Sequence, residues 1–321
     1  MTLLSLRDLT ISPPTDALAI HALDGLDLDI EAAEQLALLG NRYSGAALLA
    51  DVLCPPPDCR VRARRGTIWI GTEARGRMSL TRAQKLHPDL VLRAPSDPTA
   101  KINGRRSLSH ELSLRMKRLG WRDRSLVLDR FADAWRDLGQ GDPEAVLARH
   151  CTSLSPLERC LVALAFLFTA KPRLIVSEEP RFMDAVLKAV YLTKLANLCR
   201  MGRVAHLFTT SSARVAAEVS DRIIVLHAGE IVETGPVADI LRAPQHPYTR
   251  LVVDLEHGRS RTEGSLLALA GQGPDQPLPE NGCRFHPRCS QALAGCFIES
   301  PRLASSGDSR VACHRPLGAD A

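Results

Sequence analysis

The apolar residues of positions 3–70 recur in short runs that are typical of β-strands. Residues 25–30 (GLDLDI) alternate apolar and polar side chains, which predicts a half-buried strand. Residues 35–39 (QLALL) are almost continuously apolar, as in a buried strand, and residues 46–53 (AALLADVL) have helical spacing. We therefore expect a strand, a loop that begins at Gly40, and then a helix.

The middle of the chain, residues 94–170, changes to helical spacing, as in SLVLDRFADAWRDL at 125–138. From residue 172 onwards, strand and helix patterns alternate again. The predicted elements are strands at 173–178 and 205–210, helices at 185–198 and 213–219, and a hairpin at 222–235 with its turn at Ala228-Gly229. This order predicts an α/β domain that contains a helical subdomain.

A change of composition near Pro244, followed by Gly- and Pro-rich residues 271–279, predicts a separate loop-rich region. We place the main domain at residues 1–243, its helical subdomain at about 94–170, and a C-terminal extension at 244–321.

Composition narrows the function classes. The chain has 321 residues, 45% hydrophobic and 24% charged, as soluble globular proteins do. Its longest apolar run, residues 161–170, is half of the ~20 residues that cross a bilayer, and its start lacks the basic region of a signal peptide. We therefore predict a cytoplasmic chain. The net charge of +5 includes Arg-rich stretches at 60–65 and 115–124, which are more typical of solvated faces than of nucleic-acid contacts.

Cysteine is the most informative residue type, because four of the nine fall close together near the end. Disulfides are not expected in the cytoplasm. These four, separated by five, six and sixteen residues, are Cys283, Cys289, Cys296 and Cys313. Soft thiolate ligands suit an iron–sulfur cluster or zinc, although the spacing is not that of a CxxC ribbon. From the residues alone, a cluster, zinc and unligated thiols all remain open.

Residues 40–47 (GNRYSGAA) carry both glycines of the phosphate loop G-x-x-x-x-G-K-[ST], between a predicted strand and a predicted helix. Ala46 stands where the loop lysine neutralises the β- and γ-phosphates, and Ala47 stands where a hydroxyl binds magnesium. What remains is a possible nest of backbone N–H groups, which attracts an anion weakly. Its members would include Gly40, Arg42, Ser44 and Gly45. A glycine-flanked turn without a ligand is the alternative.

Further segments resemble the nucleotide-binding subunits of ABC transporters over essentially the whole chain. LIVSEEP at 174–180 resembles the Walker B strand, with Glu178 at the magnesium-linked aspartate and Glu179 at the catalytic glutamate. The remaining matches are Arg93 at the Q-loop glutamine, SLSPLE at 153–158 with Ser155 at the LSGGQ signature, Asp184 at the D-loop aspartate, and Ser211 at the switch histidine. The resemblance implies an ABC-type domain, with a RecA-like core, an antiparallel β subdomain and a helical subdomain.

The departures from the family pattern fall on the chemistry rather than on the scaffold. Phosphoryl transfer depends on positioning and on charge stabilisation, and the loop lysine and the switch histidine are both missing. Glu178 could still reach a metal ion and Glu179 could still orient a water. We nevertheless expect an ABC-type ATPase site that is inactive or very weak, with weak or absent binding of ATP and magnesium.

The signature segment predicts a second loss, because the resemblance implies that it acts on nucleotide held by a partner subunit. Pro156 has no N–H to offer to a phosphate, which leaves the Ser155 hydroxyl as a donor. The same residues also form a capping box with Glu158, so they begin the apolar helix that follows.

The C-terminal extension resembles that of the dipeptide and oligopeptide branch of these subunits, including APQHPYT at 243–249. Within the branch the chain is most similar to Sap-type peptide-transport subunits, on ARRG at 63–66, LGWR at 119–122, the weak signature and CFIESPRL at 296–303. The resemblance implies that the four cysteines hold a 4Fe-4S cluster, with zinc as the alternative. We expect His286 and His314 outside the ligand set. The remaining cysteines are read as packing residues, at positions 54, 59, 151, 160 and 199.

The resemblance also implies partners: a homologous and more active ATPase subunit, two membrane-spanning permease subunits and a periplasmic substrate-binding protein. The chain would then be peripheral, on the cytoplasmic face of the inner membrane. Peptides, cationic antimicrobial peptides or polyamines are the cargo classes of such systems.

Three hypotheses follow. The main one is a catalytically degenerate half of a heterodimer, which couples ATP hydrolysis by its partner to the permease. The second keeps ATP binding and slow hydrolysis through Glu178 and Glu179. The third makes the cysteine cluster a redox or iron sensor of the same transporter.

Overall fold

The computed structural model describes residues 1–12, 23–41, 43–55, 61–72, 76–81, 88–102, 104, 106–258 and 281–318. The chain forms two compact units. The first consists of Met1–Leu3, Ile30–Gln35 and Trp69–Leu207, and the second of Leu4–Asp29, Leu36–Ile68 and Phe208–Ala321.

The strands of the first unit include the parallel pair β6 (Val91–Arg93) and β7 (Leu174–Glu178), in which Arg93 lies opposite Val176. On the other side of β7 lies β8 (Ala205–Thr210), which begins in this unit and continues into the second. Most of β7 is buried, as its apolar sequence predicts. The end of β4 (Arg62–Thr72) pairs antiparallel with β5 (Gly76–Ser79).

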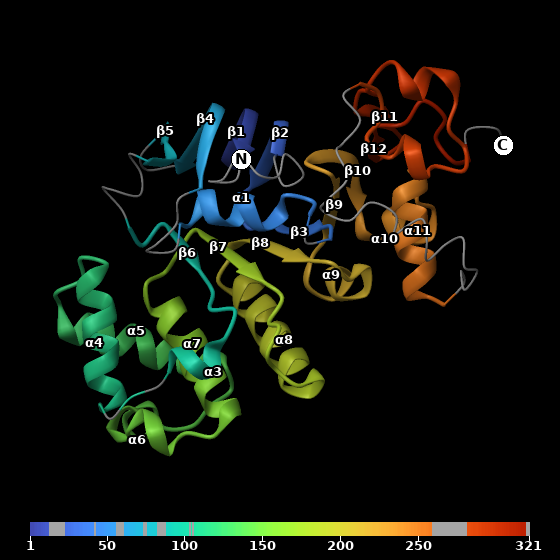
Figure 1. Cartoon of the computed structure of the whole chain (residues 1–321). Coiled ribbons are helices and arrows are strands. Elements are labelled where there is room, and N and C mark those ends of the chain that lie inside the picture. Colours follow the sequence, from blue (N-terminus) through green and yellow to red (C-terminus); the bar gives the residue numbers. More distant parts are fainter. Residues whose placement is uncertain are drawn as a thin grey trace. The chain divides into compact units, whose positions relative to one another are not determined.

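Most helices of the first unit form one group (Figure 1). They are α3 (Pro98–Lys101), α4 (Leu108–Arg118), α5 (Arg124–Asp137), α6 (Pro143–Ala148) and α7 (Pro156–Thr169). Because α7 is apolar around most of its circumference, it is buried among its neighbours. Phe131 of α5 packs on Phe166 of α7 with ring centroids 5.8 Å apart. Helix α8 (Ala185–Met201) follows β7 in the chain.

The second unit holds most of β1 (Thr2–Ser12), β2 (Leu23–Glu31) and β4, in the order β2-β1-β4. Its other strands run in the order β11-β12-β10-β9-β3. Their bounds are Gln35–Leu39 for β3, Arg222–His227 for β9, Glu230–Pro236 for β10, Ala304–Ser306 for β11 and Ser309–Val311 for β12. Strands β3 and β9 are parallel, whereas β9 and β10 form an antiparallel hairpin. The helices are α1 (Ala46–Leu53), α9 (Ala213–Val219), α10 (Val237–Arg242) and α11 (Pro247–Glu256).

Several predicted elements are confirmed. The helices at 46–53 and 213–219, the strand at 205–210 and the hairpin turn at Ala228-Gly229 lie where the pattern placed them. The helix predicted at 185–198 continues to Met201. The described part of the C-terminal extension contains more regular structure than predicted, since it includes α11 and since β12 adds an antiparallel strand to β10, with Glu233 opposite Val311. Strands of three residues are too short to show a hydrophobic period.

Among the helices of the described residues, none combines the length and the apolar character needed to cross a membrane.

Candidate functional site

The phosphate-loop segment connects β3 to α1 in the second unit. Gly45 caps α1 in a left-handed conformation with φ 92° that favours glycine. The Ser44 side chain is fully buried and lies against Gly40, where an added Cβ would come within 2.4 Å of its hydroxyl oxygen. The Ser44 N–H donates to the Asn41 carbonyl over 3.0 Å, and the Ala46 N–H donates to the Ser44 hydroxyl over 3.4 Å. Both glycines are therefore required by the shape of the loop.

The two alanines of this segment add no charge and no ligand. Ala46 is buried at the start of α1 and Ala47 is exposed. Arg42, also expected in this loop, lies outside the described residues. The described loop residues thus need glycine at Gly40 and Gly45, and alanines stand at the two positions where the phosphate-loop pattern has a lysine and a hydroxyl residue.

The carboxylates of the predicted Walker B segment lie in the first unit, where β7 ends. Glu178 is the last residue of β7, and Arg93 is the last residue of its parallel neighbour β6. Because the carboxyl ends of parallel strands share one edge of a sheet, the two side chains meet, and the Arg93 guanidinium donates a hydrogen bond to the Glu178 carboxylate. The residue at the Q-loop position is therefore bound to the residue at the metal-linked position.

Glu179 has a cationic partner of its own. The Lys188 Nζ donates to Glu179 Oε1 over 2.7 Å, from the second turn of α8. Both side chains are partly buried, with exposed fractions of 28% for Lys188 and 21% for Glu179. Lys188 is not among the site residues predicted from the sequence. The sequence does place Lys188 near the start of the helix that Asp184 caps, shortly after Glu179, and this closeness could have suggested the contact.

Asp184 is exposed and caps α8, because its Oδ1 accepts the Leu187 N–H over 2.9 Å. Ser155 caps α7 in the predicted capping box: the Glu158 N–H donates to its hydroxyl over 3.3 Å, and its own N–H donates to Glu158 Oε2 over 2.8 Å. Pro156 occupies the first helical position. The backbone N–H of Ser155 is therefore engaged within the helix cap.

Ser211 belongs to the second unit and is exposed, directly before Ser212, the N-cap residue of α9. Its hydroxyl is too short to replace a histidine ring. The second unit thus contains the phosphate-loop segment and Ser211. The first unit contains the other predicted site residues of the ATPase motifs, which are Arg93, Ser155, Glu178, Glu179 and Asp184.

The four C-terminal cysteines converge, as their clustering in the sequence suggested. Cys283, Cys289, Cys296 and Cys313 line one small cavity in the second unit, together with His286 and His314. Burial raises the pKa of the Cys283 thiol to about 11, and the three other thiols contribute in the same direction. In the described residues, no group of three or more His, Cys, Asp or Glu side chains is arranged to hold a metal ion.

Each of these sulfurs accepts a backbone hydrogen bond. The Leu293 N–H donates to Cys296 Sγ over 3.4 Å. Backbone hydrogen bonds from Phe285, Gln291 and Arg315 lower the pKa of Cys283, Cys289 and Cys313, against the larger effect of burial. In three of the four cases the donor is two residues after the cysteine. N–H donors to sulfur stabilise thiolates and are the means by which proteins tune sulfur-ligated metal centres.

The two histidines of the cavity bond to backbone carbonyls, with Nδ1 of His286 2.9 Å from the Cys283 oxygen and Nε2 of His314 2.7 Å from the Glu299 oxygen. Since a carbonyl only accepts, these nitrogens carry protons and are not available to a metal. Cys151, Cys160 and Cys199 are buried and Cys54 is half-buried, while Cys59 lies outside the described residues.

Known proteins match this chain both in one C-terminal region and over nearly its full length. Residues 232–296 match the family described as oligopeptide/dipeptide transporter, C-terminal region, and this span contains three of the four cysteines. The dipeptide transport ATP-binding protein DppD of Caldanaerobacter subterraneus is 28% identical over 93% of this chain and 94% of its own. The peptide transport system ATP-binding protein SapD of Salmonella typhimurium is 27% identical over 99% of this chain and 98% of its own.

Solved structures show a matching fold. An ATP-binding cassette of an ABC transporter in its ADP conformation aligns with a TM-score of 0.59 at 15% identity, over 80% of this chain and 99% of that one. The structure of cbiO1 from Clostridium perfringens, part of the complex cbiONQ, aligns with a TM-score of 0.60 at 16% identity, over 80% of this chain and 96% of that one. These comparisons confirm the resemblance and the ABC-type fold predicted from the motifs.

Proposed function

We propose that this chain, a homologue of the ATP-binding proteins of peptide ABC transporters, is the catalytically degenerate half of a heterodimeric transport ATPase. In this role it would pair with a more active homologous subunit and transmit the conformational change of dimer closure, driven by that subunit, to the permease. The observation that carries the proposal is that both carboxylates of the Walker B segment are already bound to cations of the same chain.

The two ion pairs oppose the chemistry of an active site. Binding of a metal ion to Glu178 would compete with the hydrogen bond that this carboxylate accepts from Arg93. Orientation of a water by Glu179 would likewise compete with Lys188 for the same carboxylate. Each ion pair therefore opposes a reaction that depends on groups already positioned and on electrostatic stabilisation of the transition state.

The phosphate loop supports the same conclusion from the second unit. With Ala46 and Ala47 in place of the lysine and the hydroxyl residue, only backbone N–H groups remain for the phosphates. An exposed Ser211 offers no imidazole. We propose weak or absent ATP binding at this site, with Ser155 alone facing nucleotide held by a partner.

The proposed partners come from the relatives. Proteins named as dipeptide and peptide transport ATP-binding proteins match nearly the full chain, and a transport ATPase requires membrane-spanning subunits that this chain does not supply in its described helices. We propose a heterodimer docked on two permease subunits at the cytoplasmic face of the inner membrane, with a substrate-binding protein on the other side. Residues 1–243 would form the ATPase domain and 244–321 the extension.

For the cysteines we propose a 4Fe-4S cluster, with zinc as the alternative occupant. Four convergent thiols that each accept a backbone N–H suit either centre, and the ligands would be Cys283, Cys289, Cys296 and Cys313. Bound there, the group would cross-link a segment that has few regular elements and so stabilise its fold. Iron, acid-labile sulfide and zinc analyses of the purified chain distinguish the two, with Cys289→Ser expected to lose the centre. A wild-type chain without any of the three would contradict this part of the proposal.

The test of the degenerate site is equilibrium binding of ATP with Mg²⁺ to the full chain. We expect weak or no binding by the wild type, and clearly tighter binding by a variant with Ala46→Lys, Ala47→Ser and Arg93→Gln. Tight binding by the wild type, accompanied by turnover, would instead support the second hypothesis of a working ATPase subunit.

A further inference from the structure

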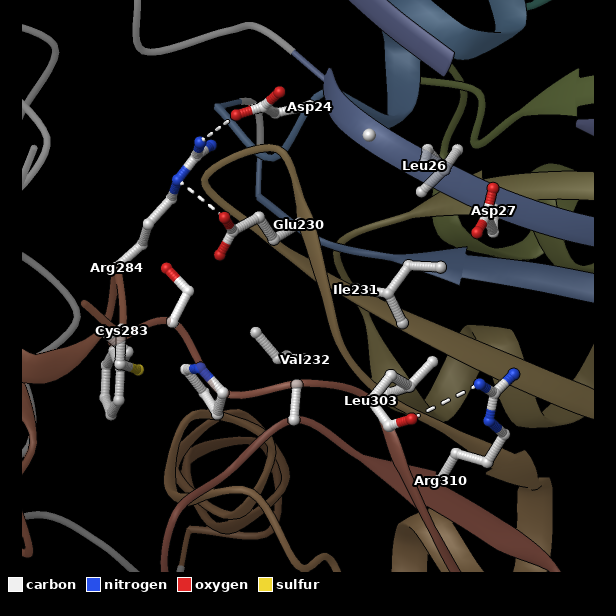
Figure 2. A pocket seen from close by; sticks show the side chains of 15 residues that line it. Asp24, Leu26, Asp27, Glu230, Ile231, Val232, Cys283, Arg284, Leu303 and Arg310 are labelled. Atoms are coloured by element: carbon white, nitrogen blue, oxygen red, sulfur yellow. Dashed lines mark hydrogen bonds and ion pairs between the residues drawn. The ribbon is translucent and has the colours of Figure 1, made fainter. Parts of the chain in front are cut away.

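The loop between the first two cysteines of the centre touches the elements that hold the phosphate loop. Arg284 follows Cys283, and its side chain is 17% exposed. Its guanidinium uses every nitrogen: one NH2 group donates to the Ala228 carbonyl over 2.6 Å, the other reaches Asp24 Oδ2 over 2.7 Å, and Nε lies 3.1 Å from Glu230 Oε1. Figure 2 shows this arginine between Asp24 and Glu230 at the rim of a cavity of about 220 Å³.

The Ala228-Gly229 turn that Arg284 contacts has a backbone conformation that is energetically unfavourable for alanine. Ala228 has φ 49° and Gly229 has φ 89°, as a tight β-hairpin turn of β9 and β10 requires. For an alanine the left-handed region is unfavourable, so the turn depends on contacts that fix it. Arg284 provides one at the Ala228 carbonyl, and the Asp24 N–H provides another at the Gly229 carbonyl over 3.1 Å.

The Ala228-Gly229 turn contacts the phosphate-loop segment directly. The Gly229 N–H donates to the Ser44 carbonyl over 3.1 Å, directly before Gly45 and the start of α1. The path from Cys283 to the loop therefore runs through Arg284, the Ala228-Gly229 turn and Ser44, and each step after the peptide bond is a hydrogen bond between described atoms.

A second path starts from the same cysteine loop. The ring of Phe285 packs edge-on against His227, with centroids 5.4 Å apart, and against Tyr248, with centroids 5.5 Å apart. Arg288 NH2 lies 2.9 Å from His227 Nε2. Burial raises the pKa of the Tyr248 hydroxyl to about 12, against smaller opposing effects of Arg288 and of the Asn41 backbone. Residues 284–288, bounded by Cys283 and Cys289, thus contact His227 and Tyr248 as well as the turn that donates to Ser44.

We infer that residues 284–288 are a brace on the phosphate loop, with Arg284 as its positioning residue, so that ligation of the flanking cysteines regulates how firmly the loop is held. The inference rests on the proposed function only in taking residues 40–47 as the nucleotide loop and the cysteines as a metal centre. Ligation of Cys283 and Cys289 would limit the motion of the segment between them. This segment is connected to Ser44 by the hydrogen bonds from Arg284 to Ala228 and from Gly229 to Ser44, which do not require bound nucleotide.

Hydrogen exchange of the full chain, read by mass spectrometry on peptides that cover residues 40–53, tests the brace without nucleotide and without turnover. Arg284→Ala should raise amide exchange in the first turn of α1 and in the hairpin turn about tenfold, because charge-assisted hydrogen bonds of this kind are lost. Arg310→Ala is the matched control, since Arg310 lines the same cavity but bonds to the Leu303 carbonyl (Figure 2). Should Arg284→Ala unfold the unit, Asp24→Ala removes the carboxylate contact and leaves Ala228 held by Arg284, with a smaller expected increase.

The regulatory part is tested by adding Zn²⁺ to the metal-free chain. We expect slower exchange both in residues 283–289 and in the loop peptide of the wild type, but only in residues 283–289 of Arg284→Ala. Equal loop exchange in the wild type, Arg284→Ala and Arg310→Ala would overturn the brace, as would equal protection of the loop by Zn²⁺ in both chains. If Zn²⁺ protects nothing while Arg284→Ala still loosens the loop, the brace stands and regulation of the loop by zinc at these cysteines is overturned.

Discussion

Arg93 donates a hydrogen bond to the Glu178 carboxylate at the point where the parallel strands β6 and β7 end. The motif resemblance places a neutral glutamine at the first position and a metal-linked carboxylate at the second. A guanidinium stays charged at every physiological pH, so the carboxylate has a fixed internal counter-ion. In the proposed function this pair stands where a metal ion would bind, so the proposed loss of activity would be linked to the stability of the fold.

This coupling predicts a non-additive effect on unfolding. Because both side chains are largely screened from solvent, Arg93→Gln and Glu178→Gln should each destabilise the chain, and the double variant should be less unstable than the sum by about 1 kcal/mol. Urea unfolding of the four chains measures the interaction. Arg181→Gln is the control, since Arg181 is exposed on the segment after β7. Additive free energies would mean that the pair contributes nothing.

The signature helix gives a second prediction. Ser155→Ala removes the side-chain acceptor of the α7 capping box and should lower the free energy of unfolding by about 1 kcal/mol. The neighbouring exposed Thr152 supplies the control, Thr152→Ala, which should be close to neutral. Equal stability of the two variants would show that this segment is not kept for its cap.

Glu158 makes the same cap dependent on pH. A hydrogen bond from Arg149, followed by one from the Ser155 backbone, lowers its pKa from 4.5 to about 2. The pKa in the folded state is below that of the unfolded state, so the stabilisation is complete above about pH 4.5 and is lost as the pH falls towards about 2. Glu158→Gln should therefore flatten the decline of unfolding free energy between about pH 5 and about pH 3. An unchanged decline would contradict the assignment.

His206 predicts a separate acid sensitivity of the first unit. Burial lowers its pKa to about 3, and its Nε2 lies 2.6 Å from the Ser177 hydroxyl. The unfolded chain takes up a proton near pH 6.5 that the folded chain refuses, so stability falls as the pH decreases from there towards about 3. His206→Gln should reduce the slope by up to about 1.4 kcal/mol per pH unit between about pH 6 and about pH 5. His110→Gln, at an exposed position of α4, should leave the slope unchanged.

Features of the fold and of the candidate site could be predicted where a few neighbouring residues determine them, and not where they depend on residues far apart in the sequence. The capping box at Ser155 and the turn at Ala228-Gly229 are encoded within a few residues, and both were predicted correctly. The pairing of Arg93 with Glu178 joins residues far apart in the sequence and depends on which strands become neighbours. The Lys188 contact depends on the direction in which α8 leaves Asp184. Arg93 can be recognised in the sequence as a departure from the motif, whereas its partner Glu178 follows only from the fold.

The cysteines illustrate the same limit. Their residue type and their clustering predicted one site, and the structure brings all four to one cavity. The backbone donors to their sulfurs and the reach of Arg284 to Ala228 arise from the path of the loop between them, which has no repeating pattern to read. That these cysteines hold a metal centre, and which one, stays a prediction.

The central claim concerns turnover, and Mg²⁺-dependent ATP hydrolysis by the purified full chain tests it most directly, with wild type and Glu179→Gln measured side by side. The account predicts the same background rate for both, because Glu179 is held by Lys188 and the loop lacks its lysine and hydroxyl residue. A robust rate in the wild type that Glu179→Gln abolishes would contradict it.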